Sequence, residues 1–319
     1  MGGRGGESAE AVTPHVLDWI ERNGDQDSWF LHVHFWDPHT PYRAPESFGN
    51  PFADEPLPAP WITEEVFSEH LMHVGPHSAN EIAMWDDSTS PQFPRHPGRL
   101  ENMADMKDMI DQYDCGVRYT DDNIAQILDL LKKKGLYGDD LAVIITSDHG
   151  ENMGELGIYG EHATADEPTC HIPMIIKWPG AKKNFVARGL HDNVDLLPTV
   201  QELLGTKIAG NYDYDGVSYA GTLLEGEDCA RESVVLTQCC HVCQRSARFG
   251  DYLYVRTIHG GYHLLPREML FNLKEDPHQQ HNLAEEHPEL CAQGARIVLE
   301  QTDRKSTRLN SSHSRISYA

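Results

Sequence analysis

Two short aliphatic runs, LAVIIT (141–146) and IPMIIKW (172–178), constrain the fold of this chain more than any other feature. Their apolar residues follow one another instead of alternating with polar ones, which is typical of strands buried on both faces. The second run is followed by NVDLLPTVQELLG (193–205), which predicts a helix entered through Asp195 and Pro198. Strands and helices that alternate in this way predict an α/β fold with a mostly parallel sheet flanked by helices.

The first half of the chain adds two helices, one strand and one long loop region. Thr13 and Pro14 have the residue types of a helix N-cap and first helical position. SWFLHVHFW (28–36) is aromatic and β-branched and predicts a strand. Apolar residues recur at spacings of three and four over 102–134, which predicts a long helix. Residues 37–105 show no sustained period, but their aromatic content favours a functional loop region over disorder.

After about residue 212 the sequence changes to short strand-like runs, SVVLTQ, DYLYVRT and EMLFNL. These predict a smaller α+β portion over 211–303, beside the main α/β layer over 1–210. The last residues, 304–319, are rich in serine, basic and without periodicity. We interpret them as a non-native or disordered tail, outside the fold.

Composition excludes several classes of function. The chain has 319 residues and a formal charge of -24, so phosphate-driven binding to nucleic acid is not expected. No run of apolar residues is long enough to span a membrane. Seven cysteines give no recognisable disulfide framework. Cys240 and Cys243 flank His241, but a single CxxC without a second pair is weak evidence for zinc.

The strongest candidate site follows the first aliphatic run. Ligands of open α/β sheets bind beyond the carboxyl ends of the strands, where Asp148 and His149 stand in ITSDHG. A carboxylate oxygen and an imidazole nitrogen are both metal ligands, and Gly150 lets the backbone turn sharply beside them. The alternative is structural: Asp148 caps the segment that follows, and His149 is an ordinary polar residue at a strand end.

The wider string SDHGENMGELGIYGEHATADEPTCHIPMIIKWPG (147–180) resembles the metal-site segment of the sulfatase family, in the alkaline-phosphatase-like superfamily. Three further segments are similar to the family and occur in its order: FWDPHTPY (35–42), NVDLLPTVQELLG, and MLFNLKEDPHQQHNLAEEHPEL (269–290). Several segments in the right order are more specific than any single motif. The resemblance covers most of residues 9–300 and implies an alkaline-phosphatase-like fold.

The resemblance also implies roles for individual residues. Asp148 and His149 would ligate a divalent cation, usually calcium in this family. His39 would contact the sulfate group or the leaving oxygen, and His162 would be a sulfate contact or a proton donor. These roles agree with the chemistry, because a cation beside an anionic ester offsets developing charge and an imidazole can act as a general acid near neutral pH.

The sequence departs from the family where many members place a lysine that binds the anion. Here Glu161 precedes His162, and the next lysine is Lys177. A carboxylate cannot replace a cation, so either His162 takes over the contact, or Lys177 or Arg43 reaches the substrate. Asp166 would orient His162 or be a solvated loop acid.

The family's nucleophile is a formylglycine made from Cys or Ser in a CxPxR or SxPxR motif, and no such motif occurs in this chain. The resemblance therefore implies that residues 1–210 are the C-terminal part of a catalytic domain. Its N-terminal third, with the nucleophile, further metal ligands and any signal peptide, would lie upstream. The chain alone is expected to be inactive. As given it carries no address and would be cytoplasmic, but with the upstream segment outside this sequence its localisation is unknown, and its oligomeric state is open.

The function implied is a metal-dependent sulfatase that hydrolyses sulfate monoesters, with a small-molecule or glycan sulfate ester as substrate and a sulfated sugar as the leading class. Two alternatives stay open. One is a phosphodiesterase or phosphonate monoester hydrolase of the same superfamily, which needs the same kinds of residue. The other is a family member that binds sulfated glycans without catalysis.

Overall fold

The computed structural model describes residues 7–82, 93–206, 214–228 and 231–313, without the side chains of 303–313. The chain forms two compact units. The first unit contains residues 1–141 and 151–161, and the second contains 142–150 and 162–319. Among the described residues, no helix combines the length and apolar character that crossing a membrane requires.

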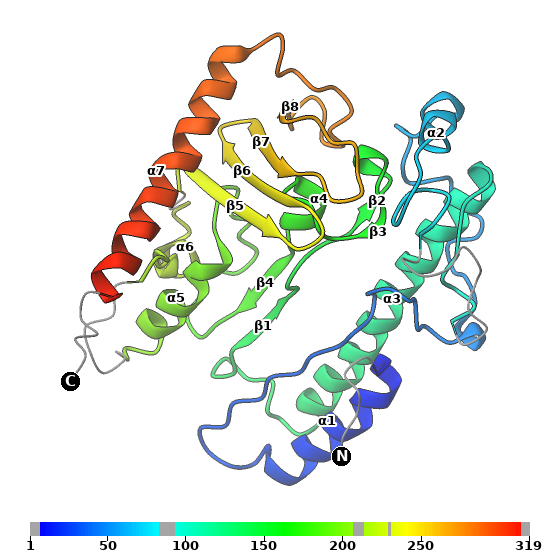
Figure 1. Cartoon of the computed structure of the whole chain (residues 1–319). Coiled ribbons are helices and arrows are strands. Elements are labelled where there is room, and N and C mark those ends of the chain that lie inside the picture. The colour runs from blue at the N-terminus through cyan, green and yellow to red at the C-terminus, as the bar shows by residue number, and fades with distance from the viewer. Residues whose placement is uncertain (1–6, 83–92, 207–213, 229–230, 314–319) are drawn as a thin grey trace. The chain divides into compact units, whose positions relative to one another are not determined.

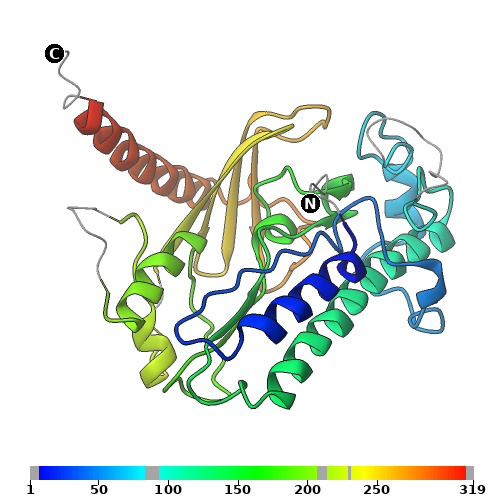
Figure 2. The ribbon, with the colours of Figure 1, turned by 90° about the horizontal axis from the view of Figure 1, so that it is seen from below.

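The first unit is built on two helices that lie side by side, α1 (Ala9–Asn23) and α3 (Met103–Lys133) (Figures 1 and 2). Val16 and Ile20 of α1 pack against Leu131 of α3. The Asn102 side chain caps α3 by accepting hydrogen bonds from the backbone N–H groups of residues 104 and 105, at 2.9 and 3.1 Å. The long helix predicted over 102–134 is confirmed.

The start of α1 differs from the prediction. The helix begins at Ala9, one turn before Thr13, and Pro14 lies inside it. The Ala9 backbone N–H donates a 2.8 Å hydrogen bond to Asp37 Oδ2, 28 residues later in the chain. A distant carboxylate therefore supplies the partner that an N-terminal helix residue needs, and the local residue types could not predict it.

Two predictions for the rest of this unit have different outcomes. Residues 37–105 form an ordered region with η1 (Glu46–Phe48) and α2 (Glu64–His70), as expected where the structure describes them. The strand predicted over 28–36 is wrong, because no strand is assigned there. Its odd-numbered residues are partly buried and its even-numbered ones exposed up to His34, so the alternation is real although no neighbouring strand pairs with it in the described structure.

The loop region and α3 share a core with a short hairpin. That hairpin consists of β2 (Asn152–Met153) and β3 (Tyr159–Glu161), joined through η2 (Glu155–Gly157). The buried residues of this shared core come from segments far apart in sequence, among them Tyr42, Ile62, Phe67, Ile82, Leu100, Met106, Met109 and Tyr159. Packing in this core holds the loop region in place, although most of that region has no regular secondary structure.

In the second unit, β1 (Val143–Thr146) and β4 (Met174–Lys177) are the two predicted aliphatic strands. They pair antiparallel, and every strand pair among the described residues is antiparallel, so the mostly parallel arrangement expected for the sheet is not what these strands form. Ile175 is 64% exposed, so burial on both faces is also wrong here. An apolar run favours burial of its side chains. It does not determine the direction in which the strand pairs or the segment with which it pairs.

The larger sheet of this unit has the order β5-β6-β7-β8: β5 (Ser233–Cys239), β6 (Cys243–Phe249), β7 (Tyr252–His259) and β8 (Glu268–Asn272). The runs predicted as strands form β5, β7 and β8, whereas the polar sequence of β6 gave no signal. Helix α7 (Pro288–His313) lies along this sheet, with Cys291 and Val298 in one cluster with Leu270 (Figure 1).

The second unit also contains short helices: α4 (Glu167–Cys170) precedes β4, and between β4 and β5 the chain forms η3 (Asn193–Asp195), α5 (Leu196–Leu203) and α6 (Ala220–Glu225). Asp195 is buried, forms a capping box with Asp192, and is paired with the Arg231 guanidinium. These contacts hold the pKa of Asp195 below its usual value despite burial. Its structural role is confirmed.

Helix α7 extends into the segment interpreted as a non-native or disordered tail. It continues to His313, so the backbone of 304–313 is helical and not disordered, and a non-native origin of 304–319 stays a prediction. Once a helix is nucleated on a packed surface, each further residue adds one hydrogen bond, which extends it through weak helix formers. Residues 314–319 lie outside the described structure.

Candidate functional site

Asp148 and His149 follow the end of β1, as the sequence predicts. Asp148 Oδ1 accepts a hydrogen bond from the His149 backbone N–H at 3.1 Å, and the carboxylate is 73% exposed. His149 Nδ1 lies 2.8 Å from the Gly150 carbonyl oxygen. A carbonyl only accepts, so Nδ1 carries the proton and the lone pair of the neutral ring is on Nε2.

This pair meets two requirements of a metal site. The lone pair of His149 is on the ring nitrogen that is not used by the backbone, and that nitrogen lies 3.9 Å from Asp148 Oδ1. Ligands that share one ion lie about 2.0–2.6 Å from it, so neighbouring ligand atoms are separated by about 3–4 Å. The donor set is one oxygen and one nitrogen, which suits several divalent cations.

Gly150 fixes the backbone behind the pair. A Cβ at this position would lie 2.0 Å from the Pro168 carbonyl oxygen, so only glycine allows this approach to α4. The Gly150 backbone N–H donates a 2.8 Å hydrogen bond to the Thr169 carbonyl. The turn after His149 is therefore seated on α4.

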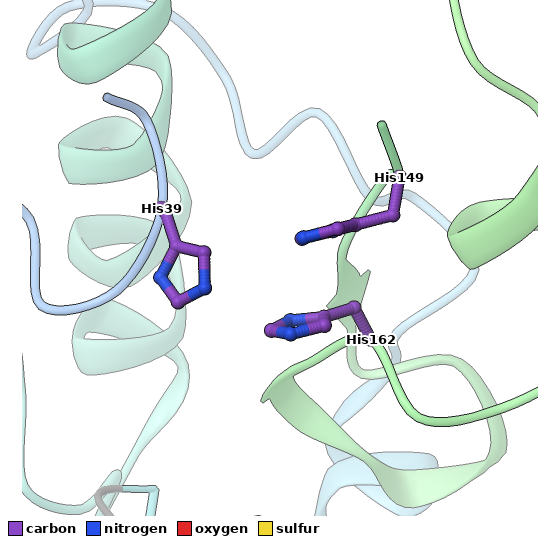
Figure 3. Close-up of side chains that lie close together, drawn as sticks. All are labelled: His39, His149 and His162. Atoms are coloured by element: carbon purple, nitrogen blue, oxygen red, sulfur yellow. The ribbon is translucent and has the colours of Figure 1, made fainter. Parts of the chain in front are cut away.

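His162 joins this pair within the second unit. Its imidazole stacks on that of His149, with ring centroids 3.9 Å apart and planes inclined by 15° (Figure 3). The two residues come from segments on either side of β2 and β3 in the sequence. The structure thus brings together Asp148, His149 and His162, three of the residues that the sequence predicts.

Two glutamines of the larger sheet, one partly and one fully buried, hold the His162 segment. Gln238 Nε2, on β5, donates to the His162 carbonyl at 2.8 Å. Gln244, on β6, is fully buried; its Oε1 accepts from the Ala165 backbone N–H at 3.0 Å, and its Nε2 donates to Thr257 Oγ1 at 3.0 Å. Sequence reasoning missed both residues: Gln238 ends the predicted run SVVLTQ, whereas Gln244 lies in β6, which gave no signal.

Asp166 is not the solvated loop acid considered for it, and its orientation of His162 stays a prediction. It is buried, so it is not a solvated loop acid, and its side chain accepts a 3.1 Å hydrogen bond from the Thr169 backbone N–H as the N-cap of α4. It thereby fixes the helix on which the Gly150 turn rests.

His39, also drawn in Figure 3, belongs to the first unit. Its Nδ1 lies 2.5 Å from the Thr40 carbonyl oxygen, which gives Nδ1 the proton as in His149. The ring packs on Trp36 with centroids 4.7 Å apart. His39 is thus oriented by its own turn.

Arg43 stabilises that same turn. Its Nη1 donates to the Pro41 carbonyl at 2.9 Å and lies 3.3 Å from the His39 carbonyl oxygen. The guanidinium also lies over the Trp36 and Phe93 rings, with Cζ 5.4 and 5.3 Å from their centroids. Burial lowers the pKa of Arg43. At least one nitrogen of the predicted anion-binding group is therefore engaged with the backbone.

Lys177 is the predicted lysine contact to the anion, and Glu161 stands near the position where many family members have a lysine. Lys177 pairs with Val143, at the end of the β1–β4 ladder opposite to Thr146, so it is separated from the Asp148 end by about 10 Å of strand. Its contact with the anion stays a prediction. Glu161, in the first unit, is buried with Oε2 2.8 Å from His77 Nε2.

The family model for sulfatases matches residues 2–206. The choline-sulfatase of Rhizobium meliloti is 28% identical over 277 residues, which are 83% of this chain and 49% of that protein. A multifunctional alkaline phosphatase superfamily protein of Trinickia caryophylli is 27% identical over 85% of this chain and 54% of its own length. The chain spans about half the length of these relatives.

Solved structures agree on the fold. A protein in complex with its substrate D-glucosamine-2-N,6-O-disulfate superposes with a TM-score of 0.71 at 18% identity, covering 95% of this chain and 70% of that one. The phosphonate monoester hydrolase of Agrobacterium radiobacter gives 0.63 at 21% identity, covering 96% and 62%. The sulfatase family model matches more than half of the chain. The chain therefore belongs to the sulfatase family and has the α/β fold of the alkaline-phosphatase-like superfamily.

Proposed function

We propose that this chain forms part of a metal-dependent enzyme that hydrolyses sulfate monoesters of sugars. The observation that carries the proposal is the cluster of Asp148, His149 and His162 at the end of β1, with a carboxylate, a ligating nitrogen and a second imidazole in contact. Membership in the sulfatase family and the disulfated glucosamine in the related complex support the substrate class.

The proposed cation is held by Asp148 and by Nε2 of His149, and calcium is the first candidate. Bound there, it would attract the sulfuryl oxygens and offset charge that develops as the S–O bond breaks. Calcium prefers oxygen ligands, whereas imidazole suits transition metals better. Manganese is therefore the second cation to test.

His162 is assigned to the anion. Because its ring rests on His149, it is held next to the metal ligand and can donate a hydrogen bond to a sulfuryl oxygen. His39 is proposed as the proton donor to the leaving oxygen. Since Thr40 occupies its Nδ1 proton, the donated proton would be the one on Nε2 of the charged ring. Arg43 would orient His39 through the turn, and Lys177 remains a weaker candidate for the anion.

A phosphonate monoester hydrolase is the second candidate. It is favoured by the similar fold of the Agrobacterium radiobacter enzyme and by the multifunctional relative from Trinickia caryophylli. Both reactions use a cation, an anion contact and a proton donor, so this cluster alone does not discriminate between them.

Activity is tested on the complete reading frame that encodes this chain, expressed with a formylglycine-generating enzyme. Release of sulfate, phosphate and phosphonate from nitrophenyl esters is measured with calcium, with manganese and after chelation. The proposal predicts cation-dependent sulfate release that falls about 100-fold or more in Asp148→Ala, and that persists in the exposed control Asp251→Ala. Faster phosphonate hydrolysis would favour the second candidate. A folded enzyme that binds sulfated glycans without turnover would leave only the binding function.

A further inference from the structure

The hairpin between β5 and β6 carries a pair of thiols that no catalytic role uses. Cys239 and Cys243 are directly opposite each other in the strand register. Their sulfur atoms lie 3.2 Å apart, and both thiols are free. Cys239 is exposed and Cys243 is partly buried. Cys240, in the turn between them, is exposed as well.

We propose that Cys239 and Cys243 are a reversible modification site, which closes to an intramolecular disulfide by exchange with a small disulfide such as oxidised glutathione. Residues directly opposite on neighbouring antiparallel strands have Cα atoms about 4.5–5.5 Å apart, within the range of natural disulfides. Bond formation brings the sulfurs about 1 Å closer, which side-chain rotation provides.

The reaction is balanced by the small disulfide. The exposed Cys239 sulfur, as thiolate, attacks one sulfur of the small disulfide and releases one small thiol. Cys243 then attacks the Cys239 sulfur of the mixed disulfide, forms the intramolecular S–S bond and releases the second small thiol. Two protein thiols are oxidised, and one small disulfide is reduced to two thiols.

The zinc alternative raised by the Cys240 and Cys243 spacing fits this geometry less well. A structural zinc site needs four ligands that converge on one point. The register instead pairs Cys239 with Cys243 and leaves Cys240 in the turn. The hydrogen bond to Cys239 raises the pKa of Cys243, so the more exposed Cys239 is the sulfur placed to react first.

The modification site is adjacent to the contacts that hold the His162 segment. Gln238 precedes Cys239, and Gln244 follows Cys243. These glutamines bind the His162 carbonyl and the Ala165 N–H. A covalent bond across the hairpin restricts the strands that carry both glutamines, so oxidation is expected to slow exchange of the Ala165 amide.

The full chain and three serine variants test the proposal, because each variant leaves a different pair of the three thiols. Cys240→Ser keeps Cys239 and Cys243, Cys239→Ser keeps Cys240 and Cys243, and Cys243→Ser keeps Cys239 and Cys240. Each protein is treated with oxidised glutathione, alkylated and digested with trypsin. The mass of the peptide that ends at Arg245 is then measured by mass spectrometry. The unchanged chain and Cys240→Ser should lose two hydrogens from this peptide and regain them with a reducing thiol.

The other two variants should retain free or glutathione-bound thiols. The proposal is overturned if Cys240→Ser prevents the loss of hydrogens, if Cys239→Ser still shows it, or if the unchanged chain stops at the glutathione adduct. Hydrogen exchange at Ala165 is compared in oxidised and reduced Cys240→Ser. Slowing by about threefold or more supports the link to the His162 segment, and equal rates contradict it.

Discussion

The loops that carry His39 and His162 are held in different ways. The His39 turn is held mainly by its own neighbours, through the Thr40 carbonyl, the Trp36 ring and the Arg43 guanidinium. The His162 segment is held by Gln238 and Gln244, from strands about eighty residues later. One loop therefore depends on local charge and ring contacts within a histidine-rich unit, whereas the other depends on neutral hydrogen bonds from a sheet.

This difference determines how each loop responds to pH and substitution. Buried histidines lie in the unit that carries the first loop, so protonation should destabilise that unit. Amide side chains do not titrate, so the second loop should respond to loss of hydrogen bonds instead.

Acidification should separate the two loops most strongly. Burial lowers the pKa values of His70 and His96, both in the first unit, to about 4. The unfolded rings titrate near 6.5, so the unfolded state binds more protons as pH falls from 6.5 towards 4, and stability decreases over this window. Each ring should cost on the order of 2 kcal/mol at pH 5 relative to pH 7.

Hydrogen exchange with mass spectrometry at pH 7 and 5, corrected for intrinsic rates, measures the protection of backbone amides in α3 and in the larger sheet separately. The first unit should lose protection, and His70→Gln and His96→Gln should each reduce that pH dependence. The exposed His15→Gln is the control. Equal loss of protection in β5 to β8 would show that the two units respond to acid in the same way, contrary to this prediction.

The next largest effect is expected for Gln244→Leu. The substitution leaves the buried Ala165 N–H and Thr257 hydroxyl without this partner, which should lower the free energy of unfolding by about 2–4 kcal/mol. Urea unfolding measures the change, with the exposed Gln293→Leu on α7 as control. Full stability of Gln244→Leu would mean that the sheet does not hold the His162 segment.

Arg43→Ala should have a smaller effect, about 1–2 kcal/mol, because the guanidinium is only partly buried and makes neutral carbonyl and ring contacts. Arg43→Lys keeps the charge but not the planar fork, so it should recover less than half of the loss. Urea unfolding again gives the free energies. Complete recovery by lysine would show that charge alone stabilises the His39 turn.

Gln238→Ala should have the smallest effect on stability, about 1 kcal/mol or less, because it removes one partly buried hydrogen bond. It should nevertheless shift the imidazole signals of His162 in NMR spectra, since the bond holds the backbone of that residue. The exposed neighbour Thr237→Ala should leave them in place. Unchanged His162 signals in Gln238→Ala would show that Gln238 does not hold the His162 segment.

The sequence predicts those parts of the site that depend on neighbouring residues. Asp148 and His149 could be located because a polar pair directly ends an aliphatic strand. Their approach to α4 could be anticipated only in part, because Gly150 signals a sharp turn without naming Pro168 as the reason.

Long-range contacts were beyond sequence reasoning for a physical reason. The cap of α1 by Asp37 and the support of His162 by Gln238 and Gln244 join segments whose polar residues have no local period. The antiparallel pairing of β1 and β4 was missed similarly, since an apolar run does not specify its partner. Such contacts depend on the assembled tertiary structure.

Manganese titration followed by NMR shows whether Asp148 and His149 hold a divalent cation beside His162. A paramagnetic ion bound there should broaden the imidazole signals of His149 and His162 before that of the exposed His15. Excess calcium should restore them, and Asp148→Ala should prevent the broadening. Broadening that is absent, or equal at His15, would contradict the claim.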